Sequence, residues 1–151
     1  MKRLLCPTDF SESAAAAERH ATRLAQALGA ELVLVHVASE GPLWHEGLIT
    51  PELRGVFEAQ RTWAADTLAA RAAALTDFGV GARSIVEVGV AWKEIVRLAK
   101  EEQADMIVMG TQGRTGLDRL LVGSVAERVH RHAPCPVLTV RPDADTKGGA
   151  V

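Results

Sequence analysis

The chain lacks three features that mark secreted, membrane-spanning and nucleic-acid-binding proteins. It has only two cysteines, Cys6 and Cys135, which lie far apart in the sequence. This excludes a CxxC pair and a disulfide framework, and it favours two reduced thiols. No apolar run approaches the ~20 residues that a membrane-spanning helix needs, and the apolar part of residues 1–7 is too short for a signal peptide. We therefore expect a soluble, cytoplasmic protein with no membrane partner.

The third missing feature is an excess of one charge sign. Seventeen lysines and arginines against nineteen acidic residues give a formal net charge of −2 at pH 7. A dedicated DNA- or RNA-binding domain normally carries a basic face, so we expect no nucleic-acid partner. A small anionic ligand held by backbone N–H groups stays open, because such a site needs little net charge.

The composition that remains is that of one globular domain. Hydrophobic residues make up 48% and charged residues 24% of a 151-residue chain, which is enough for a single core. The sequence has no internal repeat and no low-complexity linker. We expect one domain over residues 1–142 and a loose tail over residues 143–151, which are mostly polar or glycine.

Short apolar runs alternate along the chain with segments of helical period. Strands are predicted at 3–6, 32–37, 85–88, 106–109 and 137–140, and helices at 11–28, from 51 to before 79, near 92–99 and near 125–133. The runs at 32–37, 106–109 and 137–140 do not alternate, which predicts burial on both faces. The run at 85–88 is more polar and is placed at a sheet edge. This alternation predicts an α/β fold: a single open five-stranded parallel sheet with helices on both faces.

Two helix starts have recognisable caps. Ser11 is a plausible N-cap, and Gly29 is the matching stop signal; Thr50 followed by Pro51 marks the second start. The predicted inward faces are Ala14, Ala17, Ala21, Leu24 and Leu28 in the first helix, and Leu53, Phe57, Ala64, Leu68 and Leu75 in the second.

A glycine-rich segment follows the predicted strand at 106–109. Its spacing is Gly110-x2-Gly113-x9-Gly123-Ser124. Glycines permit positive φ and let the backbone approach a phosphate without a Cβ in the way. The helix that begins near Ser124 presents free N–H groups and its positive dipole end, and the Ser124 hydroxyl can cap it or donate to a phosphate. The glycines alone fit a simple strand-to-helix connection equally well, and they match neither a P-loop nor a dinucleotide fingerprint.

Five segments together resemble the universal stress protein family over nearly the whole chain. They are Cys6–Ser11, Leu34–Val37, Ala104–Gly110, Gly123–Val129 and Ala133–Leu138. The family has members that bind ATP and members that lack the phosphate loop, and the glycine spacing here is similar to the ATP-binding branch. The resemblance implies a Rossmann-like fold with strand order 3-2-1-4-5, and ATP as the ligand, with Mg²⁺ as a candidate companion on the triphosphate.

The resemblance also implies roles for individual residues. Asp9, with Pro7 and Thr8, would lie against the ribose and adenine, and Val37 and Met109 would line the adenine slot. Contacts to ribose and phosphates would come from Gly110, Gly113, Gly123, Ser124 and Val125. Arg114 would reach the outer phosphates. Gln112 stands where many relatives carry His or Arg, so a charged phosphate contact from that position is absent.

The prediction of a protein partner rests on the last predicted strand. In the family this strand pairs two subunits, which implies a homodimer through Val137, Leu138, Thr139 and Val140. An unpaired apolar edge would otherwise be an aggregation hazard.

Other readings stay open for several residues. Asp9 also fits a carboxylate that merely precedes the helix at Ser11. His36 is interpreted as a hydrogen-bonded core residue, and Trp44 and Trp63 as packing residues rather than a contact surface. His130 and His132 point to different helix faces, so we assign no metal site.

Three functions follow from these readings. The first is an ATP-binding stress-response or signalling module. The second is a slow ATPase: the loop lacks a P-loop lysine and an obvious base, so no catalytic residue is assigned and any turnover should be low. The third is a dimeric interaction module that uses no nucleotide.

Overall fold

The structure is a computed structural model that describes residues 1–39, 47, 49–112 and 122–142. Its elements in chain order are β1 (Arg3–Pro7), α1 (Glu12–Leu28), β2 (Glu31–Ala38), α3 (Pro51–Asp77), β3 (Ala82–Val88), α4 (Ala91–Glu101), β4 (Met106–Gly110), α5 (Ser124–His132) and β5 (Val137–Val140). The tail predicted to be loose, residues 143–151, lies outside the described residues.

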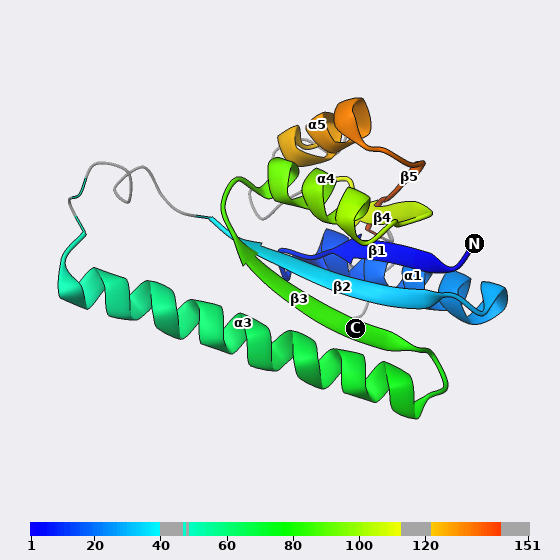
Figure 1. Ribbon diagram of the computed structural model, residues 1–151, viewed down its shortest axis with the longest axis horizontal. Coiled ribbons are helices and arrows are strands. Elements are labelled where there is room, and N and C mark those ends of the chain that lie inside the picture. The colour runs from blue at the N-terminus through cyan, green and yellow to red at the C-terminus, as the bar shows by residue number, and fades with distance from the viewer. Residues whose placement is uncertain (40–46, 48, 113–121, 143–151) are drawn as a thin grey trace, which may run out of the picture.

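The five strands form one parallel sheet in the order β3-β2-β1-β4-β5. Helices α1 and α3 pack on one face, and α4 and α5 on the other (Figure 1). The predicted fold class and strand order are therefore confirmed. Strand order reverses between β1 and β4, and in open α/β sheets ligands bind beyond the carboxyl ends of the strands at such a point.

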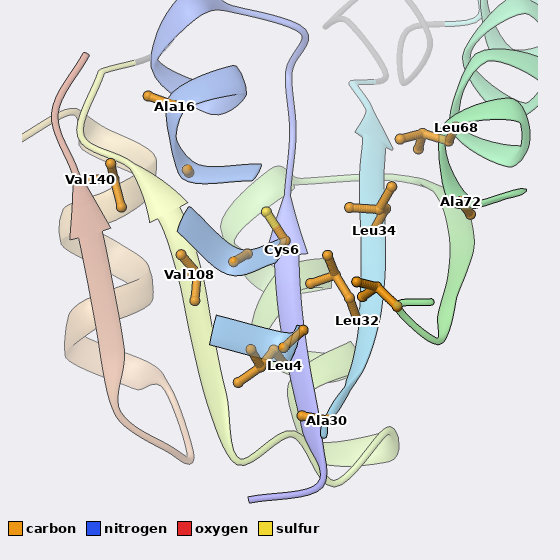
Figure 2. Close-up of a cluster of buried hydrophobic side chains, with 14 residues drawn as sticks. Leu4, Cys6, Ala16, Ala30, Leu32, Leu34, Leu68, Ala72, Val108 and Val140 are labelled. Carbon is orange, nitrogen blue, oxygen red and sulfur yellow. The ribbon is translucent and has the colours of Figure 1, made fainter. Parts of the chain in front are cut away.

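The core forms two layers because successive strand side chains point to opposite faces. Figure 2 shows the layer under α1 and α3, where Leu32 and Leu34 of β2 meet Leu68 and Ala72 of α3. The layer under α4 and α5 contains Leu5, Val33, Val35, Ile107 and Met109 from the strands. Alanines on the inner face of α1 let that helix approach the sheet closely.

The cap signals of α1 are confirmed. The Ser11 hydroxyl accepts the Ala14 N–H at 3.1 Å, and Gly29 ends the helix with φ 60°. The inward assignment of Leu28 is wrong, because its side chain is 48% exposed. Leu28 directly precedes the chain reversal at Gly29, beyond the alanines that contact the strands.

Helix α3 begins as predicted, with Pro51 in its first turn and the Thr50 hydroxyl accepting the Leu53 N–H at 3.3 Å. Ala64 and Leu68 of the predicted stripe are buried, but Leu53 and Phe57 are only half-buried. The reason is that the amino-terminal part of α3 extends past the carboxyl ends of the strands (Figure 1). Among the described helices, none is long and apolar enough to cross a membrane.

The two edge strands differ from expectation in opposite ways. β3 lies at an edge as predicted but is longer, from Ala82 to Val88. β5 has the predicted limits, yet its predicted burial on both faces is wrong, since Leu138 is 38% exposed. β5 pairs with β4 alone among the described strands, so one of its sides is left open.

Candidate functional site

A hollow of about 330 Å³ opens at the carboxyl ends of β1 and β4, where the strand order reverses. All predicted site residues that the structure describes line it: Pro7, Thr8, Asp9, Val37, Met109, Gly110, Gly123, Ser124 and Val125. The other two predicted site residues, Gly113 and Arg114, lie outside the described residues. Three strands and the start of α5 therefore bring distant parts of the chain together at one place.

The turn after β1 is fixed by its own polar groups. Thr8 is buried; its N–H donates to the Val35 carbonyl at 2.7 Å, and its hydroxyl accepts the Phe10 N–H at 3.0 Å. The Ser11 N–H donates to Asp9 Oδ1 at 3.0 Å. Asp9 thus has the helix-start role that its position suggested, and its side chain also lines the hollow.

His36 lies on the face of β2 that is turned toward α3, and it supports the same turn. Its Nδ1 lies 2.9 Å from the Thr8 carbonyl oxygen. Because a carbonyl can only accept, Nδ1 carries the proton and donates. The prediction of a hydrogen-bonded histidine is confirmed, although the ring is half-buried rather than buried.

Gly110 has a structural reason to be glycine that the sequence did not reveal. A Cβ built on it would lie 2.5 Å from Ser13 Oγ and 2.8 Å from the Ser13 carbonyl carbon. The missing side chain therefore lets α1 approach the end of β4. It is not an opening left for a phosphate, although the Gly110 backbone still lines the hollow.

The first turn of α5 faces the hollow, and several of its backbone N–H groups have no hydrogen-bond partner among the described residues. Gly123 is the N-cap, with φ −59° and ψ 157°, and no side chain in the described part of the chain caps the helix. The Gly123 N–H is used, since it donates to the Thr111 carbonyl at 2.6 Å. The N–H groups of Ser124, Val125 and Ala126 come next, at the positive end of the helix dipole. All three residues line the hollow, so an anion placed there could accept hydrogen bonds from this turn.

The rest of the lining is mainly apolar. Val35, Val37, Ile95 and Met109 contribute aliphatic and thioether surface. Among the described residues that line the hollow, Asp9 is the one with an acidic or basic side chain. No group of three His, Cys, Asp or Glu side chains that could hold a metal occurs among the described residues. This arrangement suits a flat apolar ring that bears an anionic group.

The sequence reading missed several lining residues, namely Ala14, Val35, Ser39, Ala91, Ile95, Thr111 and Ala126. A signal for some of them existed. In a parallel sheet, each helix that follows a strand begins at the carboxyl edge, so the first turns of α1, α4 and α5 must meet there. Ala14, Ala91 and Ala126 belong to those first turns.

A second, larger hollow of about 680 Å³ lies under the amino-terminal half of α3. Asp9, Val37 and Ser39 line both hollows. The larger one contains no helix N-terminus, and its donors are side chains, among them Gln60 and Arg61 of α3. Trp63 stands in its wall, 54% exposed, and packs on Phe10 with ring centroids 4.8 Å apart. Trp44 lies outside the described residues.

A sequence model of the universal stress protein family matches residues 1–141. The chain belongs to the universal stress protein family. This assignment agrees with the resemblance in its motifs and with the strand order of its sheet.

Individual universal stress proteins are similar over almost their whole length. MJ0531 of Methanocaldococcus jannaschii is 38% identical over 143 residues, covering 93% of this chain and 82% of that protein. MJ0577 of the same organism is 31% identical over 153 residues, covering 93% and 94%. The solved structure of MJ0577 superimposes with a TM-score of 0.83, covering 95% of this chain and 98% of that one. A universal stress protein from Archaeoglobus fulgidus, solved in complex with dAMP, shares the fold at 24% identity, with a TM-score of 0.60 and 93% and 97% coverage.

Proposed function

We propose that this universal stress protein binds ATP in the hollow at the carboxyl ends of β1 and β4. In this proposal it acts in the cytoplasm as a nucleotide-dependent stress-response or signalling module. The observation that carries it is the uncapped first turn of α5, which opens on an apolar hollow. N–H groups without a partner among the described residues, beside apolar walls, match the two halves of a nucleotide, its phosphates and its base.

The proposed pose follows the chemistry of the walls. The adenine lies between Val37 and Met109, and the ribose hydroxyls donate to Asp9. The phosphates accept from the N–H groups of Ser124 and Val125, with Gly113 and Arg114 as further predicted contacts. Because no cation occurs in the described lining, Mg²⁺ on the triphosphate offsets much of its charge.

The dAMP complex of the Archaeoglobus fulgidus protein supports an adenine nucleotide as ligand of this fold. At 24% identity the likeness is one of fold. The choice of ATP for this chain therefore rests on its own glycine spacing and on the α5 donors.

The binding proposal is tested on purified protein. We expect denaturation to release an adenine nucleotide that chromatography identifies. We also expect ATP with Mg²⁺ to raise the unfolding temperature, since ligand at 100 times Kd adds about 2.7 kcal/mol. Finding neither the released nucleotide nor the thermal shift would contradict the proposal.

Slow hydrolysis is the second candidate, and phosphate release over hours separates it from binding alone. The described lining offers no lysine and no base beside a nucleophile, so we expect little release. Release that persists in Gly123→Val would come from a contaminant.

We also propose a homodimer through β5. Its open side and the half-exposed Leu138 are the features of an edge that a second copy would cover. Sedimentation at tens of micromolar should give a species twice the 16.1 kDa chain mass, and Leu138→Lys should shift it to the chain mass. A wild-type protein of 16.1 kDa would contradict the dimer.

A further inference from the structure

Phe10, the residue after Asp9, has a left-handed backbone with φ 64°. Among the described residues, the one other non-glycine with positive φ is Gln103, an exposed polar residue at the end of α4 with φ 51°. A bulky side chain in this region is strained, because its Cβ lies too close to the following carbonyl oxygen. The surroundings must therefore hold Phe10 in place.

Two structural elements hold the Phe10 ring. Its centroid lies 4.8 Å from that of His36 on β2 and 4.8 Å from that of Trp63 on α3. The guanidinium carbon of Arg71, also on α3, lies 5.3 Å from the same centroid. We call Phe10, His36 and Trp63 the aromatic cluster. Contacts between aromatic rings stabilise a fold beyond the area that they bury, and two of them on one ring offset the strain.

The consequence for Asp9 is geometric. Thr8, before it, is buried and hydrogen-bonded to the Val35 carbonyl. Phe10, after it, lines only the larger hollow under α3, whereas Asp9 lines both hollows. The left-handed turn at Phe10 thus separates the two residues: the Phe10 ring lies under α3, whereas Asp9 also borders the hollow that contains the first turn of α5. His36 contributes to both arrangements, since its ring packs on Phe10 at an interplanar angle of 46° and it donates to the Thr8 carbonyl.

We infer that the aromatic cluster positions the Asp9 carboxylate for the nucleotide and so links helix α3 to nucleotide affinity. This inference rests on the proposed ATP site. Phe10 and Trp63 are positioning residues that act through Asp9, because neither lines the hollow that holds the α5 donors. Nucleotide affinity is then sensitive to a change on α3 that touches no ligand atom.

The first test measures ATP affinity by calorimetry for Phe10→Ala and Trp63→Ala. Phe10→Ala should weaken binding on the order of tenfold, the size expected when a hydrogen bond to a charged group is misplaced. Trp63→Ala should weaken it less. Phe10→Tyr and Trp63→Phe keep the ring contacts and should bind like wild type. The matched control is Phe78→Ala, since Phe78 is 82% exposed beyond the end of α3 and should change nothing.

A double-mutant cycle with Asp9→Ala separates positioning from a general structural effect. If Phe10 acts through Asp9, Phe10→Ala costs no further affinity once the carboxylate is gone. An equal loss in both backgrounds would overturn the inference. If Phe10→Ala fails to fold, Trp63→Ala runs the same cycle, because it leaves the turn sequence intact.

The outcomes also distinguish this inference from the proposed function. A wild-type protein that binds no ATP refutes both. Wild-type binding that Asp9→Ala or both alanine variants of the cluster leave unchanged refutes the inference alone. A Trp44→Phe, Trp92→Phe protein adds a spectroscopic test, since the emission of Trp63 should change when ATP saturates the site. Unchanged emission would contradict the link to α3.

Discussion

The polar groups at the two ends of the sheet differ in whether they are paired with other groups of the protein. At the amino end, Arg3, Glu31, Arg83 and Glu102 form a closed ring of ion pairs. Glu31 accepts from Arg3 at 2.7 Å and from Arg83 at 2.9 Å; Glu102 pairs with Arg83 and lies 3.6 Å from Arg3. At the carboxyl end, the N–H groups of the first α5 turn have no capping side chain among the described residues.

The difference shows where the chain can bind a ligand. Each charged side chain of the ring is paired with opposite charges from other elements. It therefore has little capacity left to bind a ligand. Burial opposes ionisation of Glu31, but hydrogen bonds from Arg3 and Arg83 outweigh it and hold its pKa below the usual value. At the other end no described residue accepts from the N–H groups of the first α5 turn, and an anion would supply acceptors for them.

The largest expected effect is a loss of folding stability when a side chain is added where α1 packs closely on the carboxyl end of β4. Gly110→Ala brings a Cβ against Ser13 and should destabilise the fold by about 1–3 kcal/mol, with valine worse. Urea unfolding measures the change. Gly55→Ala is the matched control, because nothing lies within 4 Å of its Cβ position and a helical alanine should be neutral or stabilising. Equal effects at both positions would contradict the close contact.

Local signals made much of the fold predictable. Ser11, Thr50 and Gly29 mark helix ends through groups next to them in sequence, and the limits of β5 follow from its apolar run. The exposure of Leu138 did not follow from its apolar run, because such a run does not tell an edge strand from a central one; the edge position of β5 followed only from the strand order that the family resemblance implied.

The sequence predicted part of the lining of the hollow, but not the reason for each residue in it. Gly110 and Gly123 both line the hollow, yet the structural reason for glycine at 110 is its contact with Ser13 on a distant helix. The left-handed Phe10 has no local signal either, since no glycine is present and its support comes from β2 and α3. The ion ring joins residues of β1, β2, β3 and the end of α4, which only the tertiary fold brings together.

The next effect is on affinity rather than stability. Ser124→Pro removes one N–H that faces the hollow, while proline suits the first turn of a helix and the extended Gly123 before it. ATP should bind on the order of tenfold more weakly, as when a hydrogen bond to a charged group is lost. Ser124→Ala removes the hydroxyl but keeps the N–H, so its smaller loss isolates the backbone donor. Calorimetry that finds the two variants equal would argue against an α5 phosphate site.

Breaking the ring at the amino end should have a smaller effect and leave ATP affinity unchanged. Glu31→Gln should destabilise by about 1 kcal/mol or less at pH 7, since the side chains are about one-third exposed. The pKa of Glu31 is lowered by folding, so its stabilisation is present above an ordinary glutamate pKa of roughly 4.3 and is lost as pH falls through the folded value. Unfolding curves of the two proteins should therefore converge at acidic pH. A difference that persists there would assign the effect to packing instead of charge.

The smallest expected effect is at Asp105, an exposed carboxylate beside the ring. It accepts the backbone N–H groups of Lys2 at 2.5 Å and Arg3 at 2.9 Å, and these hydrogen bonds lower its pKa. Because folding lowers this pKa as well, the stabilisation by Asp105 is present above an ordinary aspartate pKa of roughly 3.9. It is lost as the pH falls through the pKa of the folded protein. Asp105→Asn should lower the unfolding midpoint slightly at pH 7 and not at all once Asp105 is protonated, whereas Asp66→Asn on the exposed side of α3 should change neither. An NMR titration of the Asp105 carboxyl that gave an ordinary pKa would mean that the β1 amides do not hold it, and that the amino end is closed by the ion ring alone.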